Sequence, residues 1–380
     1  MEEKKNMKIC FVVDYYPPHI GGAELHIQKL VEGFALRGNQ CIVITSKTDK
    51  NSNCIEQRDN IKIVRIQTPQ FIHRLWFSVM ATPYIIYFAK SCDVIQGASY
   101  GGAMPAFLSA KILRKKSIFM VFEFMGGLWN SLESNWVKAS FYRFCENIIA
   151  HLPFDKFLAN SRYTRNCLRF MGIPDRKIEF VYGARTVESV KLKREPEAVR
   201  LELEVDKNDF VYMAYGRIGI TKGMEYFVDA VPEIFKKVPQ AKFIFVFTKS
   251  DEEIWDDIIM KLKRLPDEIY RFFPGVSREK LFEYVSAADC VVIPSVSEGF
   301  GFVALEAATF AKKIVATDAG SLPEVVSGEH IFVRPASAEA LADGCLRIFR
   351  GQAEYSEPKS FSWDVAINQL NKIYSKLIEQ

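Results

Sequence analysis

The sequence lacks the patterns that are typical of a metal site or of a covalent catalytic set. Its 380 residues include only five histidines, and its eight cysteines are scattered without a C-x-x-C pair. No Ser-His-Asp or Cys-His arrangement and no close pair of carboxylates can be picked out. We therefore expect no metal or other cofactor, and reduced cysteines, as in a cytoplasmic protein.

Long uninterrupted hydrophobic runs are also missing. The most apolar stretch, residues 71–88, is broken by a histidine, an arginine and a proline, so we do not expect it to cross a membrane. The first five residues, Met-Glu-Glu-Lys-Lys, lead into an apolar run that is too short for a signal peptide. These features predict a protein that is not secreted.

The net charge is small but unevenly distributed. Residues 1–190 hold 25 basic and 16 acidic residues, a balance of +9, whereas residues 191–380 hold 25 and 30, a balance of −5. The basic half, together with the aromatic residues of 71–88, would suit peripheral attachment to anionic lipid at the inner face of the cell membrane. A solvated basic surface over a buried helix is the more usual interpretation, because aromatic stripes usually belong to a core. No motif for nucleic acid accompanies the charge, so we expect no such partner.

Short apolar runs alternate with longer amphipathic ones in both halves of the chain. This alternation predicts α/β domains with parallel sheets covered by helices, and the chain is too long for one core. A polar, charged passage at residues 188–200 separates the two series. We predict domains at residues 1–190 and 191–357, followed by an amphipathic helix within 358–380.

The predicted strands lie at residues 8–13, 40–46, 61–66, 93–96, 117–122, 156–159, 210–215, 242–247, 290–293 and 314–317. The predicted helices lie at residues 23–37, 224–237, 251–265, 277–286 and 303–310, before the closing helix.

Two carboxylates bracket a glycine-containing turn in the second half. Glu298 follows the strand at 290–293, and Glu306 lies inside the next helix. The glycines between them let backbone N–H groups approach an anion. By helical rise the carboxylates would be about 12 Å apart, too far to act on one glycosidic bond. We interpret them as contacts to two parts of one elongated ligand. The alternative is an acid at a helix start plus a solvated helix glutamate.

A second strand-to-helix turn carries positive charge. Arg217 follows the strand at 210–215, and Lys222 precedes the helix at 224–237, with a glycine beside each. Two such cations suit a diphosphate leaving group on which negative charge develops. Isolated basic residues in loops more often face water. This turn therefore indicates a ligand site only in combination with the other glycine-bearing turns.

Paired glycines, Gly21 and Gly22, mark a third such turn at the start of the helix at 23–37. They do not form a G-x-G-x-x-G fingerprint, so they are weak evidence for dinucleotide binding. Three glycine-bearing turns of this kind in one chain favour ligand binding at the strand ends of both domains.

In combination and in order, these motifs resemble the retaining glycosyltransferase family 4, the group 1 glycosyltransferases. The resemblance is strongest over residues 210–335 and covers most of the chain. The residues that carry it are Gly216-Arg217, Lys222-Gly223, Phe273-Pro-Gly275, Tyr284-Val-Ser-Ala-Ala-Asp289, Pro294-Ser295, Glu298-Gly-Phe-Gly-Phe-Val-Ala-Leu-Glu306-Ala and Ala316-Thr-Asp-Ala-Gly320-Ser-Leu-Pro-Glu324, with weaker matches at Gly21-Gly22, Ala159-Asn160-Ser161-Arg-Tyr-Thr164 and Phe361-Ser-Trp363.

The resemblance implies a GT-B architecture, in which two Rossmann-like domains face each other across a cleft. The acceptor would bind mainly to the first domain and the donor to the second, and the closing helix would pack back on the first domain. Arg217 and Lys222 would bind the donor diphosphate, Glu306 the ribose hydroxyls and Glu298 the transferred sugar. Further donor-binding candidates are Gly21, Gly22, Gly216, Gly299, Phe300, Gly301 and Phe302, and additional candidates are Ser161 and Arg162.

The chain departs from the family pattern in two places. Family members commonly carry a histidine after the strand that here is 117–122, where this chain has Glu123 and, shortly after, Gly126. Both are candidates for the contact with the donor sugar, although an acid beside a diphosphate would need neutralisation. The usual Pro-Asn-Gly-Val-Asp is replaced by Val-Tyr-Gly-Ala-Arg at 181–185, which reverses a charge.

The expected function is retaining, front-face transfer of a hexose or N-acetylhexosamine from a UDP- or GDP-sugar to a glycan or glycolipid. Arg217, Lys222 and Glu298 are the expected catalytic residues, and the reaction is expected to need no metal. The alternatives are a non-catalytic subunit that binds nucleotide sugars, and a GT-B sugar-nucleotide epimerase or sugar phosphorylase.

Overall fold

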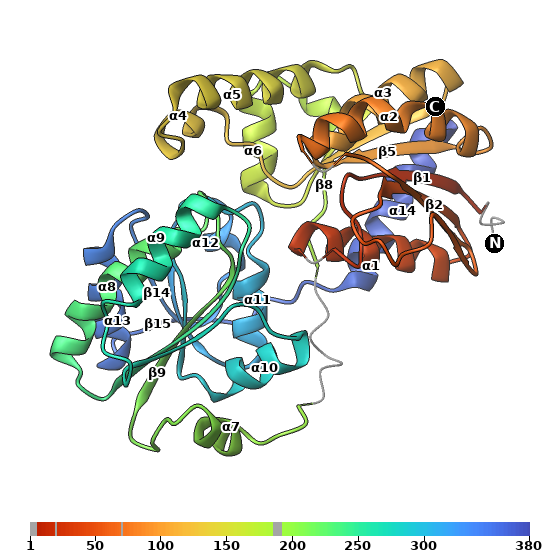
Figure 1. Cartoon of the computed structure of the whole chain (residues 1–380). Coiled ribbons are helices and arrows are strands. Elements are labelled where there is room, and N and C mark those ends of the chain that lie inside the picture. The colour runs from red at the N-terminus through yellow and green to blue at the C-terminus, as the bar shows by residue number, and fades with distance from the viewer. Residues whose placement is uncertain (1–5, 20, 70, 185–191) are drawn as a thin grey trace. The chain divides into compact units, whose positions relative to one another are not determined.

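The computed structural model describes residues 6–19, 21–69, 71–184 and 192–380. The chain forms two compact units, Met1–Arg185 with Phe361–Gln380, and Thr186–Ser360 (Figure 1). The predicted domain boundary at residue 190 and the replaced residue Arg185 lie outside the described residues. Each unit contains a mainly parallel sheet covered by helices on both faces, which confirms the predicted α/β class.

The sheet of the first unit has the strand order β3-β4-β2-β1-β5-β6-β7-β8. Among the strands formed by the described residues of this unit, only β3 is antiparallel to its neighbour. Without it, the parallel strands run 3-2-1-4-5-6-7 in chain order, a doubly wound arrangement whose direction changes between β1 and β5. The strands are β1 (Lys8–Val12), β2 (Gln40–Ser46), β3 (Ile55–Arg58), β4 (Ile61–Ile66), β5 (Val94–Ala98), β6 (Lys116–Val121), β7 (Lys156–Ala159) and β8 (Ile178–Phe180).

Helices cover both faces of this first sheet (Figure 1). One face packs on α1 (Gly22–Leu36) and on the closing helix α14 (Trp363–Glu379), where the buried Tyr374 ring lies 5.2 Å from that of Phe34. The other face packs on α2, α3 and α5. These helices and the shorter ones of this unit are α2 (His73–Phe88), α3 (Ser99–Leu113), α4 (Trp129–Leu132), α5 (Trp136–His151), α6 (Arg162–Phe170) and the 3-10 turns Gly126–Leu128 and Asp175–Lys177.

The second unit repeats the same winding. Its sheet has the order β11-β10-β9-β12-β13-β14-β15, and only β15 is antiparallel. The parallel strands run 3-2-1-4-5-6 in chain order, the Rossmann order, with the change of direction between β9 and β12. The strands are β9 (Phe210–Arg217), β10 (Ala241–Thr248), β11 (Tyr270–Phe273), β12 (Cys290–Ile293), β13 (Lys313–Thr317), β14 (Gly328–Val333) and β15 (Glu354–Ser356).

The main core of the second unit lies under α8, α9 and α13 and is built around the buried rings of Phe227, Phe243 and Phe245. The helices α10 and α11 belong to the connections on either side of β12. The helices of this unit are α7 (Pro196–Glu202), α8 (Met224–Lys237), α9 (Glu252–Leu262), α10 (Arg278–Ala287), α11 (Phe302–Thr309), α12 (Leu322–Val325) and α13 (Ala338–Phe349).

Two expectations about apolar residues can be compared with the structure. Within the described part of the chain, none of the helices has the length and apolar character needed to cross a bilayer. The stretch at 71–88 contains α2, in which only residues at intervals of four are buried, namely His73, Phe77, Ala81 and Ile85. The other residues of α2 are partly or fully exposed, so this stretch is not the buried helix that one interpretation of the sequence proposed.

Candidate active site

The predicted turns of the second unit meet because of the topology. β9 and β12 are parallel neighbours at the point where the winding changes direction, so the loops that follow them leave the sheet side by side. Backbone hydrogen bonds join the loops, since the amides of Val296 and Ser297 donate to the Thr221 carbonyl at 2.8 and 3.2 Å. This arrangement places Lys222 on one loop and Glu298 on the other.

Lys222 and Glu298 form an ion pair between the two loops. The Lys222 Nζ lies 2.8 Å from Glu298 Oε2, and the Ser295 hydroxyl donates to the same oxygen at 3.2 Å. The Glu298 side chain is only 13% exposed, so the pair lies where water screens it incompletely. Arg217, at the exposed end of β9, is the other predicted cation on the first loop.

Glycines allow these loops to approach each other closely. Gly223 has φ 60°, and a Cβ there would lie 2.3 Å from the Pro294 carbonyl oxygen of the opposite loop. Gly301, the N-cap of α11, has φ 92°. Between them, Gly299 leads into Phe300, which is 2% exposed and packs its ring 5.1 Å from that of Phe302. This predicted glycine turn is therefore a packed loop that precedes α11.

The loop after β13 holds the backbone of Glu298 in place. After β13, the amide and hydroxyl of Ser321 donate to the Glu298 carbonyl at 2.9 and 3.1 Å. Gly320 precedes it with φ 60°, and a Cβ there would lie 2.2 Å from the same carbonyl oxygen. Only glycine fits this position without moving the backbone of Glu298.

Glu306 is the most buried of the predicted charged site residues. It lies on α11, is 2% exposed, and accepts a hydrogen bond from the Tyr215 hydroxyl at 3.1 Å. Arg278, the first residue of α10, lies 3.7 Å from its other carboxylate oxygen. Because α11 begins only at Phe302, half of the interval from Glu298 is not helical, and the separation expected from helical rise has no basis. Sequence reasoning missed Tyr215 and Arg278, which carry no motif beyond the adjacent Gly216.

The candidate residues of the first unit follow three parallel strands of its sheet, of which β6 and β7 are neighbours. Gly21 and Gly22 come after β1, Glu123 and Gly126 after β6, and Ser161 and Arg162 after β7. Gly21 precedes α1 with extended backbone, and a Cβ there would lie 2.0 Å from the carboxylate of Glu24. The loops therefore emerge at the same edge of the sheet.

Several of these candidates already have structural functions. The Ser161 hydroxyl caps α6 by accepting a hydrogen bond from the Thr164 amide at 3.0 Å, whereas Arg162 is exposed. The Gly126 amide donates to Glu146 at 2.7 Å, and the Glu123 carbonyl accepts from Tyr100 at 3.4 Å. These contacts fix the loop that follows β6.

A polar cluster that sequence reasoning missed lies where the winding of the first sheet changes direction. Asp14, after β1, is 2% exposed and accepts a hydrogen bond from the Ser99 hydroxyl, after β5. Arg74 of α2 lies 3.2 Å from the other Asp14 oxygen. His73 stacks on Tyr15 at 4.8 Å, and burial is the main cause that lowers the pKa of His73. The only signal for this cluster is topological, because no motif links its members.

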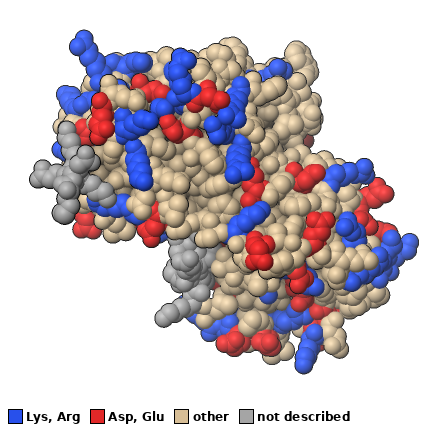
Figure 2. Space-filling model, turned by 180° about the vertical axis from the view of Figure 1, so that it is seen from behind, with Lys and Arg blue, Asp and Glu red and all other residues tan. Residues whose placement is uncertain are grey.

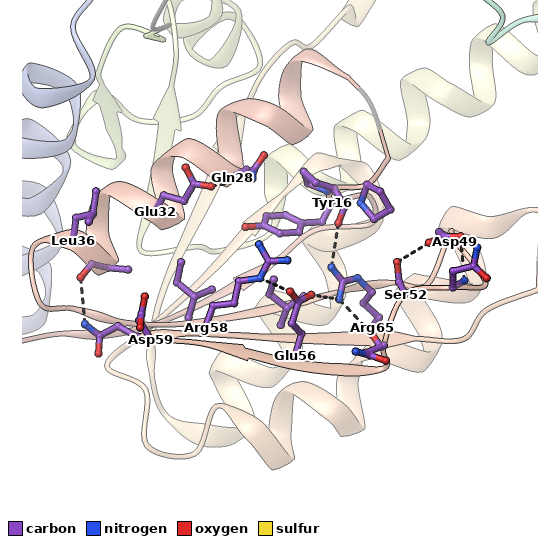
Figure 3. A pocket seen from close by; sticks show the side chains of 18 residues that line it. Tyr16, Gln28, Glu32, Leu36, Asp49, Ser52, Glu56, Arg58, Asp59 and Arg65 are labelled. Carbon is purple, nitrogen blue, oxygen red and sulfur yellow. Dashed lines mark hydrogen bonds and ion pairs between the residues drawn. The ribbon is translucent and has the colours of Figure 1, made fainter. Parts of the chain in front are cut away.

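The first unit also contains a groove of about 960 Å³ between α1 and the β3–β4 hairpin (Figure 3). Glu56 pairs with both arginines of the groove, Arg58 and Arg65. Arg65 lies 2.9 Å from Glu56 and donates to the Pro17 carbonyl at 3.2 Å, and Ser52 donates to Asp49 at 3.0 Å. None of the predicted site residues lines this groove. Among the residues that the structure describes, no group of three or more metal-ligating side chains is present.

Comparisons with known proteins agree with the geometry. The family described as Glycosyltransferase Family 4 matches residues 20–187, and the family described as Glycosyl transferases group 1 matches residues 209–350. An uncharacterized glycosyltransferase of Methanocaldococcus jannaschii is 27% identical, over 98% of this chain and 99% of its own length.

Solved structures share the fold. Sucrose-phosphate synthase from Thermosynechococcus elongatus matches with a TM-score of 0.79 at 20% identity, over 98% of this chain and 100% of its own. Anabaena HepE in complex with UDP and glucose matches with a TM-score of 0.74 at 18% identity, over 99% of this chain and 98% of its own. The fold is GT-B. Because family models match both units, the chain belongs to the group 1 glycosyltransferases, glycosyltransferase family 4.

Proposed function

We propose that this glycosyltransferase transfers a hexose or N-acetylhexosamine from a UDP- or GDP-sugar to a glycan or glycolipid, with retention of anomeric configuration and without a metal. The observation that carries the donor half is the contact between Lys222 and Glu298. In a nucleotide sugar, the transferred sugar is bonded directly to the second phosphate. A cation for the phosphate and a carboxylate for the sugar hydroxyls must therefore lie next to each other, as these two do.

The remaining donor contacts are proposed from burial and charge. Glu306 is buried, so a ribose that displaces water there would meet a carboxylate able to accept two hydroxyl hydrogen bonds. Arg217 and the backbone amides of residues 299–302 would add to Lys222 around the diphosphate. Anabaena HepE has also been solved in complex with UDP-glucose, which supports a donor of this kind.

The proposed chemistry is a front-face substitution. The bond from the anomeric carbon to the phosphate oxygen breaks, and the acceptor hydroxyl oxygen forms its bond on the same face. The acceptor proton passes to the departing phosphate oxygen. Lys222 and Arg217 stabilise the charge that develops on the diphosphate, so electrostatic preorganisation supplies most of the rate enhancement. Glu298 orients the sugar through its hydroxyls.

We place the acceptor at the first unit. The cluster of Asp14, Arg74 and Ser99 presents a carboxylate and a guanidinium at the strand ends of that sheet. Such groups bind hydroxyls and anionic groups of glycans, and ligands of doubly wound sheets bind at these ends. A glycolipid or glycan hydroxyl bound here is the proposed nucleophile, and peripheral attachment to the inner face of the cell membrane would suit a lipid-linked acceptor.

A panel of nucleotide sugars tests the proposal. We expect one UDP- or GDP-sugar to raise the melting temperature of the protein and to be hydrolysed slowly when no acceptor is present. Nuclear magnetic resonance should show the released sugar first in the anomeric configuration of the donor. Both effects should persist in buffer that contains a chelator. Arg217→Ala should weaken both effects. Epimerisation of the sugar without transfer, or binding without turnover across acceptors, would refute the proposal in favour of an epimerase or a binding subunit.

Gly320→Ala is expected to reduce transfer at least tenfold, because a Cβ would lie 2.2 Å from the Glu298 carbonyl oxygen and displace the backbone that carries this carboxylate. Left-handed backbone adds about 1–2 kcal/mol of strain for any residue other than glycine. The matched control is Gly351→Ala, where φ is 73° but no atom lies within 4 Å. Gly351→Ala should lower the melting temperature by a similar amount and leave kcat unchanged. Equal losses of kcat in both variants would contradict the proposal that Gly320 positions the Glu298 carboxylate for transfer.

A further inference from the structure

Exposed large hydrophobic side chains are concentrated in one part of the first unit. Among the described residues, 23 such side chains are exposed, and 16 of them lie between Phe71 and Ile148. The second unit has only three, Leu201, Met260 and Tyr355. Isolated exposed apolar residues need no explanation, but a concentration of this kind indicates an interaction surface.

The helices that carry these side chains form one layer. α2, α3 and α5 cover the same face of the first sheet, with α3 in contact with both of the others. Their outward residues therefore form a continuous surface, which we call the outer helical face. Its exposed apolar members are Leu75, Trp76, Val79, Tyr84 and Tyr87 on α2, Leu108 and Ile112 on α3, and Trp136, Val137, Phe141, Tyr142, Phe144 and Ile148 on α5.

α5 shows this character most clearly. Trp136, Phe141 and Phe144 are 76%, 61% and 60% exposed, whereas Ala139, Ile149 and Ala150 hold the helix to the core. Three exposed aromatic rings on a helix that also has an apolar inner side indicate a surface that another molecule covers. Trp and Tyr beside basic residues are typical of helices that lie at a membrane surface.

The exposed charged residues of these three helices are basic, although Arg74 pairs with the buried Asp14 and the partly buried Glu133 lies just before α5. α2, α3 and α5 contain a single acidic residue, Glu146, which is fully buried and accepts hydrogen bonds from Tyr100 and from the amides of Met125 and Gly126. The exposed charged residues of the three helices are Arg74, Lys111, Lys138 and Arg143, and Arg114 follows α3 directly. In Figure 2, the upper right end of the first unit, where α4 and α5 lie, is mostly tan.

From these observations we infer that the outer helical face docks on an anionic lipid bilayer, with Trp136, Phe141 and Phe144 inserted at the interface and Lys138 and Arg143 against lipid headgroups. A second copy of the chain is a poorer occupant, because a symmetric contact would bring two copies of the same basic face together, and its helices offer no exposed acid to compensate. α2 begins at His73 and Arg74, beside Asp14, so a docked face would hold the proposed acceptor cluster near the bilayer.

Sedimentation with lipid vesicles tests the inference on the full chain. We expect binding to vesicles that contain phosphatidylglycerol, weak binding to pure phosphatidylcholine, and loss of binding at high salt. Lys138→Glu with Arg143→Glu should lower the partition coefficient at least tenfold, since each basic residue near an anionic surface contributes about 1 kcal/mol. Phe141→Ser with Phe144→Ser should lower it similarly. Trp136 fluorescence should shift to the blue on binding and not in these variants.

Matched controls lie outside the outer helical face. Leu36→Ser replaces an apolar residue that is 86% exposed at the end of α1, on the opposite side of the sheet, and should bind vesicles like the wild type. Lys236→Glu with Lys237→Glu makes the same charge change on α8 in the second unit. If these controls lose as much binding as the α5 variants, the face is not specific and the inference fails.

Two further outcomes would overturn the inference. A dimer in light scattering that Phe141→Ser with Phe144→Ser dissociates would show that a second copy covers the face. Equal binding to neutral and anionic vesicles would show that the charges do not select the partner. The docking surface does not depend on the proposed transfer reaction. Hydrolysis of a soluble donor should be unchanged in the α5 variants, so failure of docking and failure of the proposed function give different results.

Discussion

Lys222→Ala is expected to lower kcat for donor turnover by about 10²–10³-fold, the loss seen when one preorganised group that stabilises developing charge is removed. Two effects act in the same direction. The diphosphate loses a cation in the transition state, and Glu298, only 13% exposed, loses the partner 2.8 Å away and repels the incoming phosphates. Steady-state kinetics of donor hydrolysis or transfer gives kcat and KM separately.

A double variant separates these two effects. If Lys222 only neutralises Glu298, then Lys222→Ala combined with Glu298→Gln should restore activity to the level of Glu298→Gln alone. If Lys222 acts on the leaving diphosphate, as we propose, the double variant stays much slower than Glu298→Gln alone. Lys249→Ala, which removes a surface lysine paired with Glu252 at 2.9 Å, is the control and should leave kcat within twofold. Restoration of activity in the double variant would overturn the proposed function of Lys222.

The parts of the fold that could be predicted from sequence have a clear hydrophobic period. The strands β2, β4, β7 and β12 and the helix α8 occupy the ranges that their patterns indicate. α5 was missed because its aromatic residues point outward, so its pattern does not have one apolar side. α3 was missed because Gly101, Gly102 and Pro105 are usual helix breakers. The structure explains Gly102, where a Cβ would lie 2.3 Å from the Val12 carbonyl oxygen.

The candidate site divides in the same way. Lys222 and Glu298 could be predicted because each lies in a glycine-bearing turn directly after a strand. The contact between Lys222 and Glu298 could not be predicted from the sequence, since it depends on β9 and β12 being neighbours. Tyr215 and Asp14 carry no local signal, and their partners are 91 and 85 residues away along the chain. Only the strand order brings such residues together, so local patterns find the loops and the topology determines the contacts.

Glu306→Gln is expected to weaken donor binding about 10–100-fold while kcat at saturating donor changes much less. Glutamine keeps the shape of the side chain but cannot accept two hydroxyl hydrogen bonds as a charged group, and a hydrogen bond to a charged group is worth about 1.5–3 kcal/mol. A ribose lies away from the reacting bond, so its contacts act on substrate and transition state alike and appear in KM. Calorimetric titration with UDP and GDP gives Kd directly and identifies the base.

Two neighbours of Glu306 serve as matched variants. Tyr215→Phe removes the hydroxyl that donates to Glu306 at 3.1 Å, and Arg278→Gln removes the ion pair at 3.7 Å. Because the carboxylate stays in both, Kd for the nucleotide should rise less than fivefold. If Tyr215→Phe weakens binding as much as Glu306→Gln, then Glu306 serves to position Tyr215 and does not hold the ribose. If Glu306→Gln leaves Kd within threefold of the wild type, the buried carboxylate is structural, and the donor must be anchored by the loops around Lys222 and Glu298 alone.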